Sequence, residues 1–155
     1  MSIKQNKDAV YKLNQAINSG DLSILPDLFH HDYVFHINPE VKGVDGITQF
    51  FSAQLCAYPD YNEQINFMVA EGDLVAVFYT ISGSFPKAFR GIALTGESFC
   101  CPICVLARFE DGKQTDAWPY YDTMEAFKSL GKIKGIRKSR LPVLKDAYTA
   151  PQTVS

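Results

Sequence analysis

Trp118, Tyr120 and Asp122 are three side chains that together could carry acid/base chemistry. Strand side chains repeat every two residues, so in an extended segment all three lie on one side of a sheet. A carboxylate held between aromatic rings is poorly solvated, which makes it a better proton acceptor near neutral pH. Asp122 could then take a proton from a carbon next to a carbonyl group and return it later. Alternatively, Asp122 caps a helix that begins at Thr123.

His36 and Arg108 are two further candidates for catalysis. His36 could donate a hydrogen bond to an enolate oxygen or orient a water molecule, or it could be a satisfied core or rim residue. Arg108 could hold a substrate carboxylate or stabilise an oxyanion. It could equally pair with Asp116 or Glu110 on the outside of the sheet. Each residue therefore has a catalytic and a structural interpretation.

Aromatic and apolar side chains could form the walls of a site for a ring-bearing or conjugated ligand. The candidates for substrate binding are Tyr33, Phe51, Leu106, Trp118 and Tyr120. The aromatic members would serve equally well as plain core residues.

The helices that must support such a site lie mostly in the first third of the chain. Residues 4–18 and residues 44–57 carry apolar side chains at helical spacing, which predicts two amphipathic helices. Between them, Asp21 could cap a short helix over residues 22–29. Pro26 fits only near a first turn, so this helix is predicted to be short or broken.

Strand patterns dominate from residue 61 onwards, and one strand precedes them at residues 33–37. In that first strand Tyr33, Phe35 and Ile37 share one face, and Val34 and His36 share the other. Four consecutive strands are predicted at residues 62–70, 74–82, 98–110 and 113–122. A loop at residues 83–96 and a short helix at residues 123–130 complete the pattern.

This order of elements predicts an α+β fold, because the helices and the strands are largely segregated along the chain. We expect a strongly curved, mostly antiparallel sheet with helices on one face, which leaves a cone-shaped pocket. One domain over residues 1–131 and a basic tail over residues 132–155 are predicted. The tail has a net charge of +5, so the rest of the chain has −7, which argues against nucleic-acid binding.

The composition, 46% apolar and 21% charged, is typical of a globular protein. The first residues lack an apolar run and no segment is long enough to cross a membrane, so we expect a cytoplasmic protein. Cys101 and Cys104 have the spacing of a metal-ligand pair, but Cys56 alone supplies no second pair, so no metal is expected. Buried, free cysteines are expected instead. Dinucleotide and phosphate-loop motifs are absent, which favours chemistry without a cofactor.

Short motifs along residues 6–131 resemble the SnoaL-like polyketide cyclase branch of the nuclear-transport-factor-2 (NTF2) superfamily. The matching pieces are Ser19-Gly20-Asp21, Asp32-Tyr33-Val34-Phe35-His36, Gly43-Val44-Asp45-Gly46, Tyr58-Pro59-Asp60-Tyr61, Glu71-Gly72-Asp73, Thr95-Gly96-Glu97-Ser98, Arg108 to Lys113, Trp118, Asp122 and Leu130-Gly131. The resemblance implies an NTF2-like α+β barrel, and it implies that Asp122 occupies the position of the acid/base aspartate of the cyclases. At residue 108 the best-studied cyclases of aromatic polyketides have histidine, whereas this chain has Arg108.

The hairpin around Asp111-Gly112 decides which side chains share a face with Asp122. A two-residue turn pairs Glu110 with Lys113 and puts Cys101, Ile103, Val105 and Phe109 on that face. A three-residue turn pairs Phe109 with Lys113 and puts Arg108, Leu106, Cys104 and Cys100 there. We favour the three-residue turn, because the resemblance requires residue 108 to share the pocket with Asp122.

Together these features predict a cofactor-free cyclase or isomerase for a polyketide-like carbonyl substrate, with Asp122 as the acid/base and His36 or Arg108 at the enolate. One alternative is a hydrolase or hydratase that activates water against an epoxide or alkene, for which Asp116 is the nearby second carboxylate. Another is a ligand-binding module without catalysis. The outer face of such a sheet is a natural dimer surface, so we expect a homodimer.

Overall fold

The computed structural model describes residues 2–84, 88–89, 92–93 and 98–122. The predicted helix at residues 123–130 and the basic tail lie outside the described residues, as does most of the predicted loop at residues 83–96. The possible role of Asp122 as a cap of that helix therefore stays a prediction.

Helix α1 (Ile3–Ser19) confirms the first predicted helix. Ser2 caps it: its side-chain oxygen accepts a hydrogen bond from the backbone N–H of Gln5, and the Gln5 side chain binds the backbone of Ser2 in return. The helix ends at Gly20, whose φ of 77° is a left-handed conformation that glycine adopts without strain. Its apolar face is buried against the sheet.

The second helix is short, as predicted, but it begins three residues later than expected. Helix α2 (Leu25–Leu28) is four residues long and has Pro26 in its first turn, because proline fits only there. The predicted cap by Asp21 is wrong, since the Asp21 carboxylate accepts a hydrogen bond from the backbone N–H of Ser23 at 3.0 Å, before the helix begins. Strand β1 (Phe29–Phe35) follows α2 directly and so starts four residues earlier than predicted. His30 and His31 are part of this strand.

A two-residue strand β2 (Val41–Lys42) leads into helix α3 (Gly43–Ala57), the third predicted helix. Ile47 on its inner face is fully buried. Phe50, Phe51 and Leu55, on the same apolar face, pack against the core and remain partly exposed.

Four long strands make up most of the sheet, as predicted: β3 (Asn62–Glu71), β4 (Leu74–Ser84), β7 (Ser98–Glu110) and β8 (Lys113–Tyr121). A small separate hairpin pairs β5 (Ala88–Phe89) with β6 (Ile92–Ala93). The six-stranded sheet has the order β2-β1-β8-β7-β4-β3. All its pairings are antiparallel except that of β1 with β8, which is parallel.

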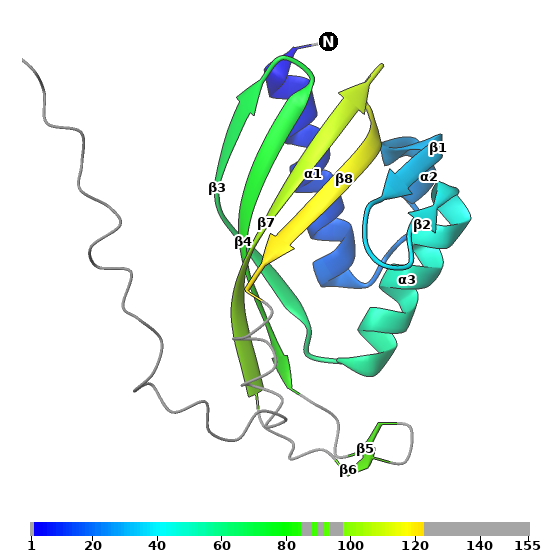
Figure 1. The fold of residues 1–155 in the computed structure, drawn as a ribbon, viewed down its shortest axis with the longest axis vertical. Helices are drawn as coiled ribbons and strands as arrows, with labels where there is room; N and C mark the ends of the chain where they lie inside the picture. Colours follow the sequence, from blue (N-terminus) through cyan, green and yellow to red (C-terminus); the bar gives the residue numbers. More distant parts are fainter. Residues whose placement is uncertain (1, 85–87, 90–91, 94–97, 123–155) are drawn as a thin grey trace, which may run out of the picture.

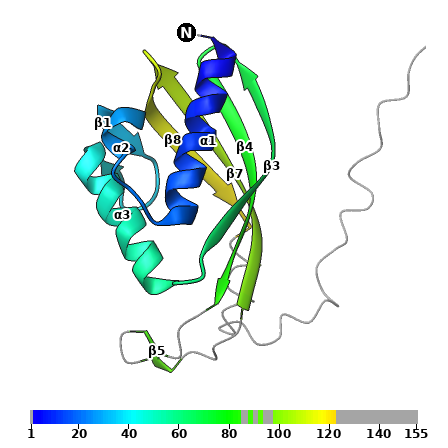
Figure 2. The same cartoon turned by 180° about the vertical axis from the view of Figure 1, so that it is seen from behind.

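The described helices lie on one face of this sheet, and none of them covers the other face (Figures 1 and 2). This confirms the predicted α+β architecture, although the sheet stays open and does not close into a barrel. We call the helix-covered face the inner face and the opposite one the outer face. None of the described helices is long and apolar enough to span a membrane.

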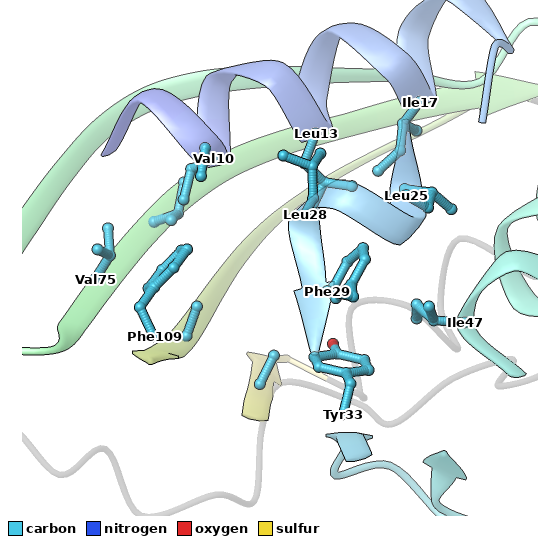
Figure 3. Packing of buried hydrophobic residues seen from close by; sticks show 14 of the residues in the cluster. Val10, Leu13, Ile17, Leu25, Leu28, Phe29, Tyr33, Ile47, Val75 and Phe109 are labelled. Atoms are coloured by element: carbon cyan, nitrogen blue, oxygen red, sulfur yellow. The ribbon is translucent and has the colours of Figure 1, made fainter. Parts of the chain in front are cut away.

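The hydrophobic core fills the space between the helices and the inner face (Figure 3). Its centre is formed by Val10, Leu13, Ile17, Leu25, Leu28, Phe29, Ile47, Val75 and Phe109. Burial of each large apolar side chain contributes about 1.5–3 kcal/mol, so α1, α2 and β1 are tied together mainly by this cluster. Beyond it, towards α3, the packing opens into a cavity.

The hairpin between β7 and β8 has a two-residue turn, so the favoured three-residue turn is wrong. Asp111 and Gly112 have φ values of 47° and 80°, and Glu110 pairs with Lys113. The register then shifts: Phe109 pairs with Gln114, but Arg108 pairs with Asp116. Thr115 is thus the extra residue of a β-bulge.

The bulge reverses the faces of β8. Beyond Thr115, Asp116, Trp118 and Tyr120 lie opposite Arg108, Leu106 and Cys104. The three-residue turn was expected to put these side chains on one face, and they do share a face, but the bulge brings this about and the residues that pair are different. The shared face, however, is the outer one.

Candidate functional site

A cavity of about 540 Å³ lies between the helices and the inner face, a volume typical of small-molecule sites. It is lined by Leu13, Ile17, Phe29, Tyr33, Phe35, His36, Ile37, Asn38, Phe50, Phe51, Gln54, Tyr61, Glu63, Tyr79, Ile81, Ile103, Val105, Gln114, Ala117, Pro119 and Tyr121. The alternation of each strand explains this set, because every second residue of β1, β4, β7 and β8 faces inwards. The walls are largely apolar.

Glu63 is the one acidic side chain among the described residues that line the cavity. The hydroxyl of Tyr61 donates a hydrogen bond to Glu63 Oε1 at 2.7 Å. Burial raises the pKa of Glu63 above its ordinary value, and the hydrogen bond from Tyr61 offsets part of this effect. Glu63 is therefore a stronger base than an exposed glutamate would be.

The backbone of Glu63 is held in place by helix α1. Asn18 Nδ2 donates to the Glu63 carbonyl oxygen at 2.8 Å, and the Glu63 N–H donates to Asn18 Oδ1 at 2.8 Å. Asn14 Nδ2 donates to the same carbonyl at 2.9 Å. Because β3 is an edge strand, these two asparagines satisfy backbone groups that no neighbouring strand can reach. They fix where the Glu63 side chain enters the cavity.

Three buried tyrosines, Tyr33, Tyr61 and Tyr79, add hydroxyl groups to the cavity. Burial raises the pKa of each, and the nearby charge of Glu63 raises the pKa of Tyr61 and of Tyr79 further. All three therefore remain neutral, and Tyr33 and Tyr79 can donate hydrogen bonds to a ligand oxygen.

His36 lies at the rim of the cavity, and its ring points to the outer face. Its Nε2 forms a hydrogen bond with Asp116 Oδ1 at 2.9 Å, and its Nδ1 lies 3.3 Å from Glu40 Oε1. The ring stacks on Trp118 with 4.8 Å between centroids and 2° between planes. Its backbone N–H donates to the Ala117 carbonyl oxygen at 2.9 Å, which ties the rim to β8.

Arg108 is on the outer face as well. Its Nε lies 3.6 Å from Asp73 Oδ2, its Nη1 lies 4.0 Å from Asp116 Oδ2, and its guanidinium carbon is 5.1 Å from the centroid of the Trp118 ring. The outside pairing with Asp116, one of the two interpretations of Arg108, is thus present. We call His36, Glu40, Arg108, Asp116 and Trp118 the outer cluster.

The pKa of Asp116 reflects this environment. Partial burial by itself would raise the pKa, but the hydrogen bond with His36 and the charge of Arg108 bring it below its ordinary value. Asp116 is therefore a charged, partnered carboxylate and a weaker base than Glu63.

The predicted site residues divide between the two faces. Tyr33 and Phe51 line the cavity, and His36 lies at its rim. Arg108, Leu106 and Trp118 belong to the outer face. Asp122 is exposed and, with Tyr120, lines a second hollow that also includes Phe67, Phe78 and Cys104.

The four cysteines are free, and none of them is buried. Cys56 and Cys100 are exposed, and Cys101 and Cys104 are partly exposed, so the prediction of buried cysteines is wrong.

Sequence reasoning missed Glu63 and Tyr61. A signal for both was present, because Tyr61, Glu63 and Ile65 alternate along one strand and a carboxylate in phase with apolar residues is unusual. A strand that buries one side of such a pattern must turn the carboxylate inwards.

The family model of the SnoaL-like polyketide cyclases matches residues 7–130. Among solved structures, a candidate hydroxylase from Streptomyces galilaeus, AclR, is 25% identical, with 88% of this chain and 91% of that chain covered and a TM-score of 0.75. A candidate polyketide cyclase from Streptomyces antibioticus, IdmH, is 27% identical, with 82% and 99% covered and a TM-score of 0.71. TsrD from Streptomyces laurentii is 21% identical, with 86% and 99% covered and a TM-score of 0.77.

A search of curated proteins finds no match. The family match agrees with the open curved sheet and its helix-covered cavity, and together they assign the chain to a family. The chain belongs to the SnoaL-like polyketide cyclase family, within the NTF2-like fold.

Proposed function

We propose that the protein is a cofactor-free cyclase or isomerase that acts on a carbonyl-bearing, polyketide-like intermediate by acid/base chemistry. The observation that carries this proposal is the cavity, which encloses an ionisable carboxyl group within mostly apolar walls. Such walls exclude water and strengthen every electrostatic interaction inside. Proton transfer to and from carbon benefits from both effects.

The walls favour a flat, ring-bearing or conjugated substrate. Phe50 packs edge-to-face against Phe35 and Phe51, with centroid distances of 5.4 Å and 5.6 Å. Rings in this arrangement present both faces and edges to a ligand. The tyrosine hydroxyls add donors that could stabilise the oxygen of an enolate.

Two places could supply the acid/base group. One is Glu63 inside the cavity, and the other is Asp122, with His36 and Arg108, as the sequence suggested. Asp122 is exposed, and Arg108 carries ion pairs on the outer face. The surroundings of Glu63 support the proposed chemistry better.

A hydrolytic function on an epoxide or alkene would be favoured by a second carboxylate next to the first. Asp116, the nearby candidate, is directed to the outer face by the bulge. Cyclisation or isomerisation is therefore the better-supported reaction.

The experiment is α-proton exchange of 2-tetralone, a neutral bicyclic ketone, in D₂O, followed by mass spectrometry. The protein is expected to accelerate exchange over buffer and over heat-unfolded protein. Exchange that stays at the buffer rate, across 2-tetralone and cyclohexane-1,3-dione, would contradict the proposal.

We also propose that two copies pair through the outer face. Phe67, Val69 and Tyr120 on this face are 55%, 59% and 61% exposed, and Phe67 stacks on Phe78 at 4.3 Å. An exposed apolar patch of this kind marks an interaction surface. Sedimentation should give a dimer that Phe67→Lys dissociates, and a monomeric wild type would contradict this proposal.

A further inference from the structure

We infer that Glu63 is the catalytic proton-transfer residue of the cavity, that Tyr61 positions it, and that the substrate it serves is electrically neutral. This inference rests on the proposed function and names the group that performs it. It stands on the geometry of β3 and α1 around the cavity.

The first argument is placement. Glu63 lies in the inward phase of β3, opposite Ile81 of β4, and both residues line the cavity. Tyr61 holds one oxygen of its carboxyl group at 2.7 Å. A carboxyl group with a fixed rotamer inside a substrate-sized cavity meets the geometric requirement for a general base.

The second argument is support. The N–H and the carbonyl of Glu63 are bound by side chains from α1, two of these bonds with Asn18 and one with Asn14. Three hydrogen bonds to the backbone of one residue restrict its movement relative to α1, which also lines the cavity. Catalytic groups need this kind of positioning, because misplacement by about 1 Å can cost about 100-fold in rate.

The third argument is the reaction that these groups permit. The Glu63 carboxylate accepts the proton from a carbon next to a carbonyl group, and the C–H electron pair forms the enolate. The enolate carbon then attacks a second carbonyl carbon of the same substrate, which forms the new C–C bond and an alkoxide. The Glu63 carboxylic acid returns its proton to the alkoxide and is regenerated as carboxylate. In an isomerisation it returns the proton to another carbon instead.

The fourth argument is the charge of the cavity. No lysine or arginine is among the described residues that line it, and His36 at the rim has its ring between Asp116 and Glu40. A substrate carboxylate would therefore meet Glu63 without a cationic partner, which is unfavourable in an apolar site. A neutral ketone or polyketone avoids this cost.

The raised pKa of Glu63 agrees with this role, because a base with a higher proton affinity accepts a proton from carbon more readily. A purely structural interpretation, in which Glu63 and Tyr61 only fill the cavity wall, predicts no effect on the reaction beyond folding. The two interpretations differ in measurable ways.

The test compares Glu63→Gln with wild type in the exchange of 2-tetralone in D₂O across pH. Glu71→Gln is the matched control, since Glu71 ends the same strand and is exposed. We expect Glu63→Gln to lower the exchange rate by about 100-fold or more and Glu71→Gln to leave it unchanged. Circular dichroism and thermal unfolding establish that each variant is folded.

Tyr61→Phe tests the positioning role and remains informative if Glu63→Gln does not fold. Loss of the donor raises the pKa of Glu63 further, so the pH limb of the exchange rate should move to higher pH, with a several-fold lower rate. A pH profile that does not move would overturn the role of Tyr61. Wild-type exchange that persists in Glu63→Gln would overturn the inference alone, whereas no wild-type exchange would overturn the proposed function and the inference with it.

Substrate charge is tested by competition. Neutral 2-naphthol, which resembles the enol of 2-tetralone, is expected to inhibit wild-type exchange at least tenfold more strongly than 2-naphthoate, which carries a carboxylate. Equal or stronger inhibition by 2-naphthoate would overturn the neutral-substrate part of the inference.

Discussion

The two faces of the sheet hold their carboxyl groups in opposite ways. On the inner face, Glu63 lies in an apolar cavity with a neutral tyrosine as partner, and burial raises its pKa. On the outer face, Asp116 has His36 and Arg108 beside it, and its pKa is lowered. The difference shows that a carboxylate close to histidine and arginine is stabilised in its charged form, while one without cations keeps its proton affinity.

This comparison also explains why the residue types of the outer cluster do not by themselves indicate a catalytic site. The outer cluster contains the residue types that mechanisms use, yet its members neutralise one another. Glu63 has an uncharged partner and a cavity in front of it. Four predictions test this difference between the inner and the outer face.

The largest effect on the exchange rate is expected from a larger side chain on the inner face. Val105 lines the cavity, and its neighbour Leu106 faces the other way, opposite Trp118. Val105→Trp should fill the cavity and lower 2-tetralone exchange by about 100-fold, through lost positioning of the ketone. Leu106→Trp should leave the rate within about threefold of wild type. Similar losses in both variants would mean that the cavity is not where the ketone binds.

The next effect is expected from the support of Glu63. Asn18→Ala removes two hydrogen bonds to the Glu63 backbone, which should lower the exchange rate about tenfold and the stability by about 1–2 kcal/mol. Asn66→Ala is the control, because the Asn66 side chain bonds to the Thr80 side chain in the same sheet and not to Glu63. Kinetics and urea unfolding measure the two effects, and equal rates in both variants would contradict a positioning role for α1.

A smaller effect is expected from the outer cluster. Asp116→Asn should cost about 1 kcal/mol near neutral pH and change the exchange rate by less than about threefold. Because the folded pKa of Asp116 is lowered, its contribution is present above the unfolded pKa and is lost as pH falls through the folded pKa. The stability difference between wild type and Asp116→Asn should therefore vanish in acid, as urea unfolding at several pH values would reveal. A large loss of exchange would move the chemistry to the outer face.

The smallest effect is a gain in thermal stability, whereas the preceding substitutions lower stability or the exchange rate. The folded pKa of Glu63 is raised, so the charged form that prevails at higher pH destabilises the fold. Glu63→Gln should thus increase Tm at pH 9, by on the order of 2 °C, and the gain should shrink as pH falls through the pKa of Glu63. Scanning calorimetry measures it. A variant that is less stable than wild type at every pH would contradict a desolvated carboxylate.

Much of the fold was predictable from the sequence, because periodicity is a local property. Helix α1, helix α3 and the four long strands match their predicted positions closely. The errors were local: helix α2 begins later than predicted, and the hairpin before β8 has a two-residue turn followed by a bulge at Thr115. A bulge has no strong signal in a single sequence, since many residue types tolerate it.

The site was only partly predictable. Tyr33 and Phe51 follow from strand and helix faces, and both line the cavity. Asp122 was predicted from a resemblance and from its alternation with Trp118 and Tyr120, and these two aromatic residues lie on the outer face. The hydrogen bonds from Asn14 and Asn18 to Glu63 join residues more than 40 positions apart, and no local sequence pattern predicts such a contact.

The bulge at Thr115 also determines how this chain tolerates insertions and deletions. A deletion of that one residue, with the turn unchanged, would remove the bulge and leave Arg108 paired with Asp116, so that both faces of β8 keep their side chains. If Thr115 were instead kept and paired regularly with Arg108, the rest of β8 would rotate by one position, Asp116, Trp118 and Tyr120 would enter the cavity, and Ala117, Pro119 and Tyr121 would leave it. The lining of the cavity therefore tolerates the loss of Thr115, whereas a strand that kept Thr115 and lost the bulge would have a different interior.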